Sequence, residues 1–89
     1  MTTIPQKLRD LAISDTGFLF DPYTGSTFSL NEPGMTVLSG LREGQSVAQV
    51  AAKLREAFEV PPGVDVERDV GEFVHLMRRS GLVPEDYTP

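Results

Sequence analysis

The hydrophobic pattern of this chain changes its period once, at Leu30–Asn31, and this change constrains the fold more than any other feature. Before that point apolar and polar residues alternate, which is typical of β-strands. After it apolar residues recur every three or four positions, which is typical of amphipathic helices. Because 89 residues leave room for only one domain, the sequence predicts a single α+β domain in which a small antiparallel sheet precedes the helices.

Three short strands are predicted before this change, at residues 11–14, 18–21 and 26–30. Residues 15–17 form a turn between the first two strands, and residues 21–25 form a hairpin loop before the third. In the third strand, Phe28 and Leu30 face the core, because successive side chains of a strand point to opposite faces.

Three helices follow, and each has a recognisable start and end. The predicted N-caps are Asn31, Ser46 (in a capping box with Gln49) and Asp65. The residues that stop the helices are Gly44, the run Pro61-Pro62-Gly63, and Gly81. After Gly81, Leu82 is placed to contact Met77 in a Schellman ending. The third helix is thus predicted over residues 66–80.

The order of elements also predicts which surfaces stay open. Three short helices cannot cover both faces of a three-stranded sheet, so one face and at least one strand edge remain free. Residues 1–10 show no sustained period and are interpreted as a flexible lead-in. Residues 84–89 are a short acidic tail, which leaves residues 11–83 as the domain.

The residues that usually carry catalysis are nearly absent. The chain has no cysteine and a single histidine, His75, so neither a thiolate site nor a multi-ligand zinc site is expected. Acidic residues at the start of the third helix are explained by the helix dipole. No nucleophile motif or phosphate-binding loop is present. We therefore expect no catalytic residue, no metal and no cofactor.

Charge and hydropathy limit the partners and the location. The net charge of −5 disfavours the phosphate backbone of nucleic acids, and Lys and Arg are absent between Arg9 and Arg42. No apolar run exceeds three residues, far short of the roughly 18 that a membrane span needs, and no signal peptide is recognisable. The sequence predicts a cytoplasmic protein that binds neither nucleic acid nor membrane.

Gly71 lies in the middle of the third helix, where a glycine costs about 1 kcal/mol relative to alanine. Its neighbours around the helix are Val74 and Arg78, which together form a strip that is small, partly apolar and basic at one end. Two interpretations fit this strip. The helix packs closely on the sheet there, or the strip lines a shallow groove that admits another backbone.

A series of short motifs runs from the second strand to the end of the last helix. Its members are Leu19-Phe20-Asp21-Pro22, Gly25, Phe28-Ser29-Leu30-Asn31-Glu32, Val37-Leu38, Leu41, Gly44, Ser46, Asp69-Val70, Phe73, Leu76 and Gly81-Leu82-Val83. In their order and spacing these motifs resemble the PqqD family. The resemblance covers roughly residues 11–83, and no single motif carries it alone.

Members of that family are peptide chaperones, also called RiPP recognition elements, with three strands and three helices in a winged-helix-like arrangement. The resemblance implies that this chain is not an enzyme. It would bind the leader segment of a ribosomally made precursor peptide and deliver it to a modifying enzyme, often a radical SAM enzyme. The broad family fits this sequence better than the members dedicated to PQQ.

In such domains the leader lies as an added strand in the groove between the third strand and the third helix. Carried over to this sequence, the peptide-binding residues are Thr27, Phe28, Ser29 and Leu30 on the strand and Val70, Gly71, Val74, Met77 and Arg78 on the helix. The strand would supply a main-chain ladder, and the two valines and Met77 an apolar groove. Gly71 would allow close approach, and Arg78 would contact an acidic leader residue.

Two other functions stay open on the sequence. A winged-helix protein that binds nucleic acid has a similar order of elements, although the acidic charge disfavours it. An enzyme-docking scaffold would use the helices without holding a peptide. A free strand edge is also compatible with either a monomer or an edge-paired dimer.

Overall fold

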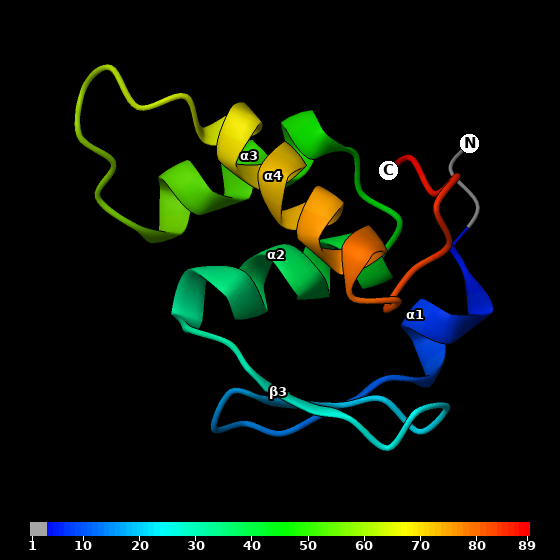
Figure 1. Ribbon diagram of the computed structural model, residues 1–89. Helices are drawn as coiled ribbons and strands as arrows, with labels where there is room; N and C mark the ends of the chain where they lie inside the picture. The colour runs from blue at the N-terminus through cyan, green and yellow to red at the C-terminus, as the bar shows by residue number, and fades with distance from the viewer. Residues whose placement is uncertain (1–3) are drawn as a thin grey trace.

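The computed structural model describes residues 4–89 and shows a layer of helices above a small sheet (Figure 1). In chain order the elements are α1 (Gln6–Asp10), β1 (Ala12–Ile13), β2 (Phe18–Phe20), β3 (Thr27–Ser29), α2 (Glu32–Arg42), α3 (Val47–Ala57) and α4 (Val66–Arg79). The three strands form one antiparallel sheet. The predicted α+β order, a three-stranded sheet followed by three helices, is confirmed.

β3 is an edge strand, because the order of strands in the sheet is β1-β2-β3. Its regular pairing covers three residues rather than the predicted five. The ladder nevertheless continues on both sides. The N–H of Asp21 donates to the oxygen of Ser26 at 2.9 Å, and the N–H of Leu30 donates to the oxygen of Gly17 at 2.7 Å. Among the described residues, no strand lies against the outer edge of β3.

One face of the sheet is buried under the helices and the other is open. On the inner face Leu19 is only 1% exposed, and Phe28 and Leu30 pack partly buried against the same core. Phe18 and Phe20 flank Leu19 in β2 and so point to the outer face, where they are 52% and 42% exposed. The predicted open face is confirmed, and it carries these two phenylalanines.

The predicted starts of the three long helices and the predicted end of α4 are confirmed by their hydrogen bonds, whereas α3 ends at Ala57, before the predicted stop at Pro61-Pro62-Gly63. Each predicted N-cap side chain accepts from a backbone N–H of the first turn: Asn31 from Gly34, Ser46 from Gln49, and Asp65 from Arg68. Ser46 and Gln49 complete the reciprocal capping box. Helix α4 ends in the predicted Schellman motif, with Gly81 at φ 75° and the N–H of Leu82 donating to the oxygen of Met77 at 2.9 Å.

The segment that the sequence predicts as a flexible lead-in contains helix α1. Leu8 of α1 is completely buried in the core, and the hydroxyl of Tyr23 donates to the carboxylate of Asp10. The prediction is wrong for this helix because a single buried leucine in five residues produces no detectable period. The first three residues of the predicted lead-in lie outside the described part of the chain.

The C-terminal segment also packs on the domain. Leu82, Val83 and Tyr87 are buried with the core. Arg78 of α4 donates from Nε and Nη2 to the backbone oxygen of Tyr87, at 2.9 and 2.6 Å. The core thus extends beyond the predicted limits of 11–83 at both ends, to Leu8 and to Tyr87.

Asp21 is the buried charged residue of the described chain and joins the β2–β3 hairpin to α1. Its carboxylate accepts from the N–H of Tyr23 at 2.9 Å and from the hydroxyl of Thr24 at 3.2 Å, and it lies 3.4 Å from Nζ of Lys7. Burial by itself raises the pKa of Asp21, but these hydrogen bonds and Lys7 outweigh burial and hold the pKa below its usual value. Asp21 therefore acts as an ionised anchor.

Replacing Leu8 with alanine is expected to lower the free energy of unfolding by about 2–5 kcal/mol, because it empties a fully buried site. Urea unfolding followed by circular dichroism measures the change. Arg9→Ala, at the exposed neighbouring position, is the control and should stay within about 0.5 kcal/mol of the unmodified chain. Equal stability of the two variants would show that α1 is not part of the cooperative core.

Candidate functional site

The free edge of β3 exposes the backbone groups of alternate residues. In an antiparallel ladder, the N–H and C=O of successive residues point alternately toward and away from the neighbouring strand. Ser26 and Leu30 both bond to the β2 side, so Phe28, two residues from each, directs its backbone groups to β2 as well. The backbone groups of Thr27 and Ser29 therefore point to the free edge. The backbone groups of Phe28, which the sequence also assigns to the peptide ladder, face β2 instead and are not free to pair with a peptide.

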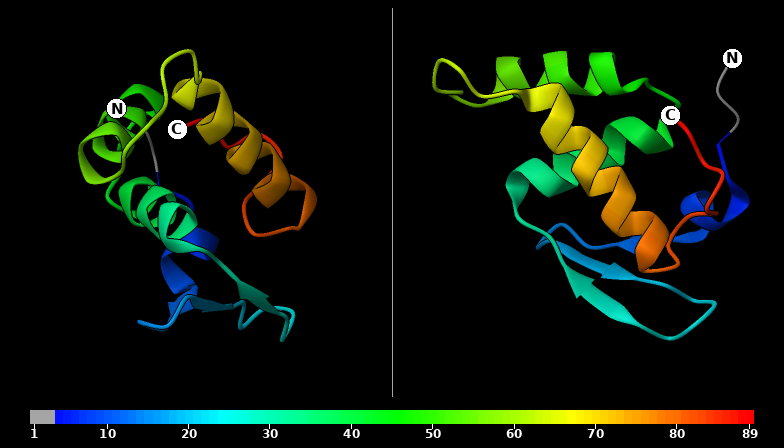
Figure 2. Two further views of the ribbon diagram at one scale, coloured as in Figure 1. Left: turned by 90° about the vertical axis from the view of Figure 1, so that its left-hand side faces the viewer. Right: turned by 45° about the horizontal axis from the view of Figure 1, so that its top comes forward.

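Phe73 of α4 lies at the corner where β3 leads into α2. A Cβ built on Gly34, in the first turn of α2, would lie 3.6 Å from Cε2 of Phe73 and 3.6 Å from Cβ of Leu30. Leu76 follows one turn later on the same flank and is 58% exposed. The C-terminal half of α4 lies across from β3 in both views of Figure 2. We call the free edge of β3, together with Phe73 and Leu76, the edge surface.

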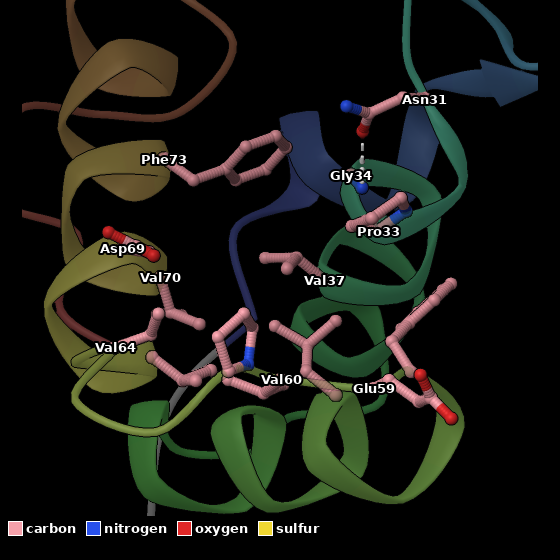
Figure 3. A pocket seen from close by; sticks show the side chains of 14 residues that line it. Asn31, Pro33, Gly34, Val37, Glu59, Val60, Val64, Asp69, Val70 and Phe73 are labelled. Carbon is pink, nitrogen blue, oxygen red and sulfur yellow. Dashed lines mark hydrogen bonds between the residues drawn. The ribbon is translucent and has the colours of Figure 1, made fainter.

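An apolar pocket of about 360 Å³ adjoins the edge surface at Phe73 (Figure 3). It lies between the first turn of α2, the end of α3, the link from α3 to α4, and the first half of α4. Its apolar walls include Val37, Phe58, Val60, Val64, Val70 and Phe73. Its polar lining consists of Asn31, Glu59 and Asp69, and the side chain of Asn31 is already bonded to Gly34. Such a lining suits an apolar side chain.

The structure buries three of the five helix residues that the sequence assigns to peptide binding. Val70, Val74 and Met77 are 1%, 2% and 3% exposed and belong to the core. Val70 also lines the pocket. Val74 and Met77 instead hold α4 against the rest of the domain. The predicted apolar groove is therefore not an exposed feature of these three residues.

Gly71 and Arg78 lie on the flank of α4 that faces away from Phe73. Gly71 is about 160° from Phe73 around the helix, at 3.6 residues per turn. A Cβ at Gly71 would meet nothing within 4 Å, so the interpretation as close packing on the sheet is wrong. Arg78 is directed to the C-terminal segment, where its guanidinium binds the oxygen of Tyr87.

Phe73 and Leu76 are the surface residues that sequence reasoning did not assign to the site. The helical period places Phe73 in the core stripe, but it is only partly buried. The sequence feature that could have indicated this surface is Leu76, an apolar residue outside the core stripe. No sequence feature indicates the pocket, because hydrophobic periodicity does not predict the path of the link through Pro61-Pro62-Gly63.

Two classes of site find no support in the described residues. Between residues 4 and 89, no three side chains of His, Cys, Asp or Glu are grouped to hold a metal ion. Over the same range, no helix is long and apolar enough to cross a membrane.

Two solved structures are similar to this chain. One is a lasso peptide synthetase B1 complexed with the leader peptide. It is 32% identical, with a TM-score of 0.67, over 81% of this chain and 85% of that one. The other is TbiB1 in complex with the TbiA(beta) leader peptide. It is 26% identical, with a TM-score of 0.72, over 89% of this chain and 91% of that one. No curated protein matches the chain.

The family model described as coenzyme PQQ synthesis protein D (PqqD) matches residues 17–83. The matched range begins at the turn that pairs with Leu30 and ends just after the Schellman motif of α4. It therefore contains β2, β3, the three long helices, the edge surface and the pocket. On this match over most of its length, the chain belongs to the PqqD family.

Proposed function

We propose that this chain is a non-catalytic peptide chaperone that binds the leader segment of a ribosomally made precursor and presents it to a modifying enzyme. The observation that carries the proposal is the free edge of β3 in a member of the PqqD family. Both similar solved structures hold a leader peptide, which supports the same class of partner here. Because the precursor is made by ribosomes, the proposal places this step in the cytoplasm.

Backbone pairing holds the peptide with little dependence on its sequence. Thr27 and Ser29 offer two N–H donors and two C=O acceptors along the free edge, and an extended peptide pairs with them as a fourth strand. Each such hydrogen bond contributes about 0.5–1.5 kcal/mol net. Two copies of this chain paired through β3 would occupy the same groups, so an edge-paired dimer and the leader complex exclude each other.

Apolar contacts beside the strand supply selectivity. Alternate side chains of the added strand face α4, where Leu76 is exposed and Phe73 is partly exposed. Where the peptide passes Asn31, one larger apolar side chain enters the pocket, and its burial contributes about 1.5–3 kcal/mol. Val70 forms part of the pocket wall. The other predicted helix residues, namely Gly71, Val74, Met77 and Arg78, make no contact with the peptide in this arrangement.

Presentation to an enzyme requires a second surface that stays free when the peptide is bound. The outer face of the sheet carries the exposed side chains of Phe18 and Phe20. The peptide lies along the edge of the sheet and not across this face, so both surfaces can be occupied together. The modifying enzyme docks on the outer face, where two neighbouring aromatic side chains form an apolar patch.

Ser29→Pro removes one outward N–H and places a ring on the free edge, where proline is tolerated by the sheet. Its affinity for a leader peptide that the unmodified chain binds is expected to fall at least about tenfold. Ser29→Ala keeps the N–H and should bind within about twofold of the unmodified chain. Fluorescence anisotropy with the labelled leader measures both, and circular dichroism confirms that both are folded.

Equal affinities of the proline and alanine variants would exclude the β3 ladder. A labelled DNA duplex at low salt tests the nucleic-acid alternative. Binding of the duplex by this chain, with no binding of the leader, would overturn the proposed function.

The double variant Phe18→Ser and Phe20→Ser is expected to bind the leader within about twofold of the unmodified chain. It should, however, no longer present the precursor efficiently to the modifying enzyme. Without these two exposed rings the enzyme loses its apolar contact with the sheet. The rate at which the modifying enzyme processes the full precursor should fall about tenfold or more. Leader affinity is the internal control. An unchanged rate would place the enzyme contact elsewhere on the chain.

A further inference from the structure

The charged residues at the apolar pocket are all acidic. Glu59 and Asp69 are its charged lining residues, and both are exposed. Figure 3 shows them at opposite sides of the pocket, with Asp69 on α4 and Glu59 on the segment that follows α3. Neither carboxylate forms an ion pair with another residue between 4 and 89. Both charges are therefore free to act on a bound molecule.

Folding explains one of these carboxylates but not the other. Asp69 lies in the first turn of α4, where the positive end of the helix dipole stabilises an anion. Glu59 lies two residues beyond Ala57, the last residue of α3. Glu59 therefore has no helix N-terminus to stabilise its charge, and none of the ion pairs among the described residues includes it.

The cations of α4 do not neutralise this region. Nε of Arg68 lies 3.5 Å from the carboxylate of Glu72, and Arg78 is held by the oxygen of Tyr87 on the other flank. The segment that contains β3 has no Lys or Arg at all. No Lys or Arg lines the pocket, so the charges at its mouth are acidic, opposite to the basic groove that the sequence places at Arg78.

We infer that the leader segment carries a lysine or arginine next to the apolar residue that enters the pocket, and that Glu59 and Asp69 select this cation. The inference rests on the proposed function and adds the chemistry of the recognised sequence. A long basic side chain suits the place, because its methylene groups lie along apolar surface while its charged end reaches a carboxylate at the rim. Leaders with an acidic residue at that position are rejected by repulsion.

A random library of displayed 12-residue peptides, selected against the unmodified chain, tests this preference without knowledge of the natural leader. Enriched peptides should contain Lys or Arg directly beside a large apolar residue. Selection against the charge-reversed variant Glu59→Lys/Asp69→Lys should enrich Asp or Glu at that position instead. The same basic preference in both selections would overturn the inference.

Charge removal gives the quantitative test with the best-enriched peptide as the probe. Glu59→Gln/Asp69→Asn is expected to weaken its binding about three- to tenfold, the effect of two exposed ion pairs. The matched control Glu56→Gln/Glu67→Gln removes the same number of charges from α3 and α4 at positions that do not line this pocket, and should change affinity less than twofold. The difference between the two variants should shrink at 0.5 M salt.

Failure of this inference is distinguishable from failure of the proposed function. If the enriched peptides compete with the leader and lose affinity with Ser29→Pro but show no basic preference, the strand-addition site stands and the charge selection is wrong. If neither the library nor the leader binds the unmodified chain, both proposals are wrong. Equal losses in the pocket variant and its control would also reject the charge selection, because they indicate only a general effect of net charge.

Discussion

The corner at Leu30–Asn31 positions the site, because it belongs to the sheet and to the helices at once. The N–H of Leu30 closes the ladder on the oxygen of Gly17 at 2.7 Å, and the side chain of Asn31 starts α2 by accepting from Gly34. A Cβ at Gly17 would lie only 2.5 Å from the oxygen of Leu30, and its φ is 93°, so this turn requires glycine. Phe73 packs at the same corner, which fixes α4 relative to the free edge of β3.

Local features of this fold could be predicted from the sequence, and relations between distant segments could not. The N-cap at Asn31 and the other helix ends depend on hydrogen bonds within a few residues, so residue type and spacing reveal them. Helix α1 was missed because its stability comes from burying Leu8 against distant elements. Helical periodicity likewise identifies the buried stripe of α4 but not which of its two flanks faces β3, because that depends on tertiary packing. From the sequence, Gly71 is therefore placed in the site, whereas in the structure Phe73 lies at the Leu30–Asn31 corner.

The domain keeps the two proposed interaction surfaces apart despite its small size. Backbone groups of β3 and the apolar pocket lie on one side, and the aromatic outer face of the sheet, with Phe18 and Phe20, lies on another. Burial of Leu8 and Tyr87 extends the core at both ends of the chain, so these surfaces are supported by a larger core than residues 11–83 alone provide. An acidic chain of net charge −5 thus offers an uncharged edge for strand addition beside a negative pocket mouth.

Mapping of backbone amide shifts is the most direct measurement of whether the peptide adds to β3. The ¹⁵N-labelled chain is titrated with a leader peptide that it binds. If the peptide adds to β3, the largest changes are expected at Thr27 and Ser29 on β3 and at Phe73 and Leu76 on α4, with little change at Gly71. Changes centred on Gly71, with the amides of β3 unaffected, would contradict strand addition.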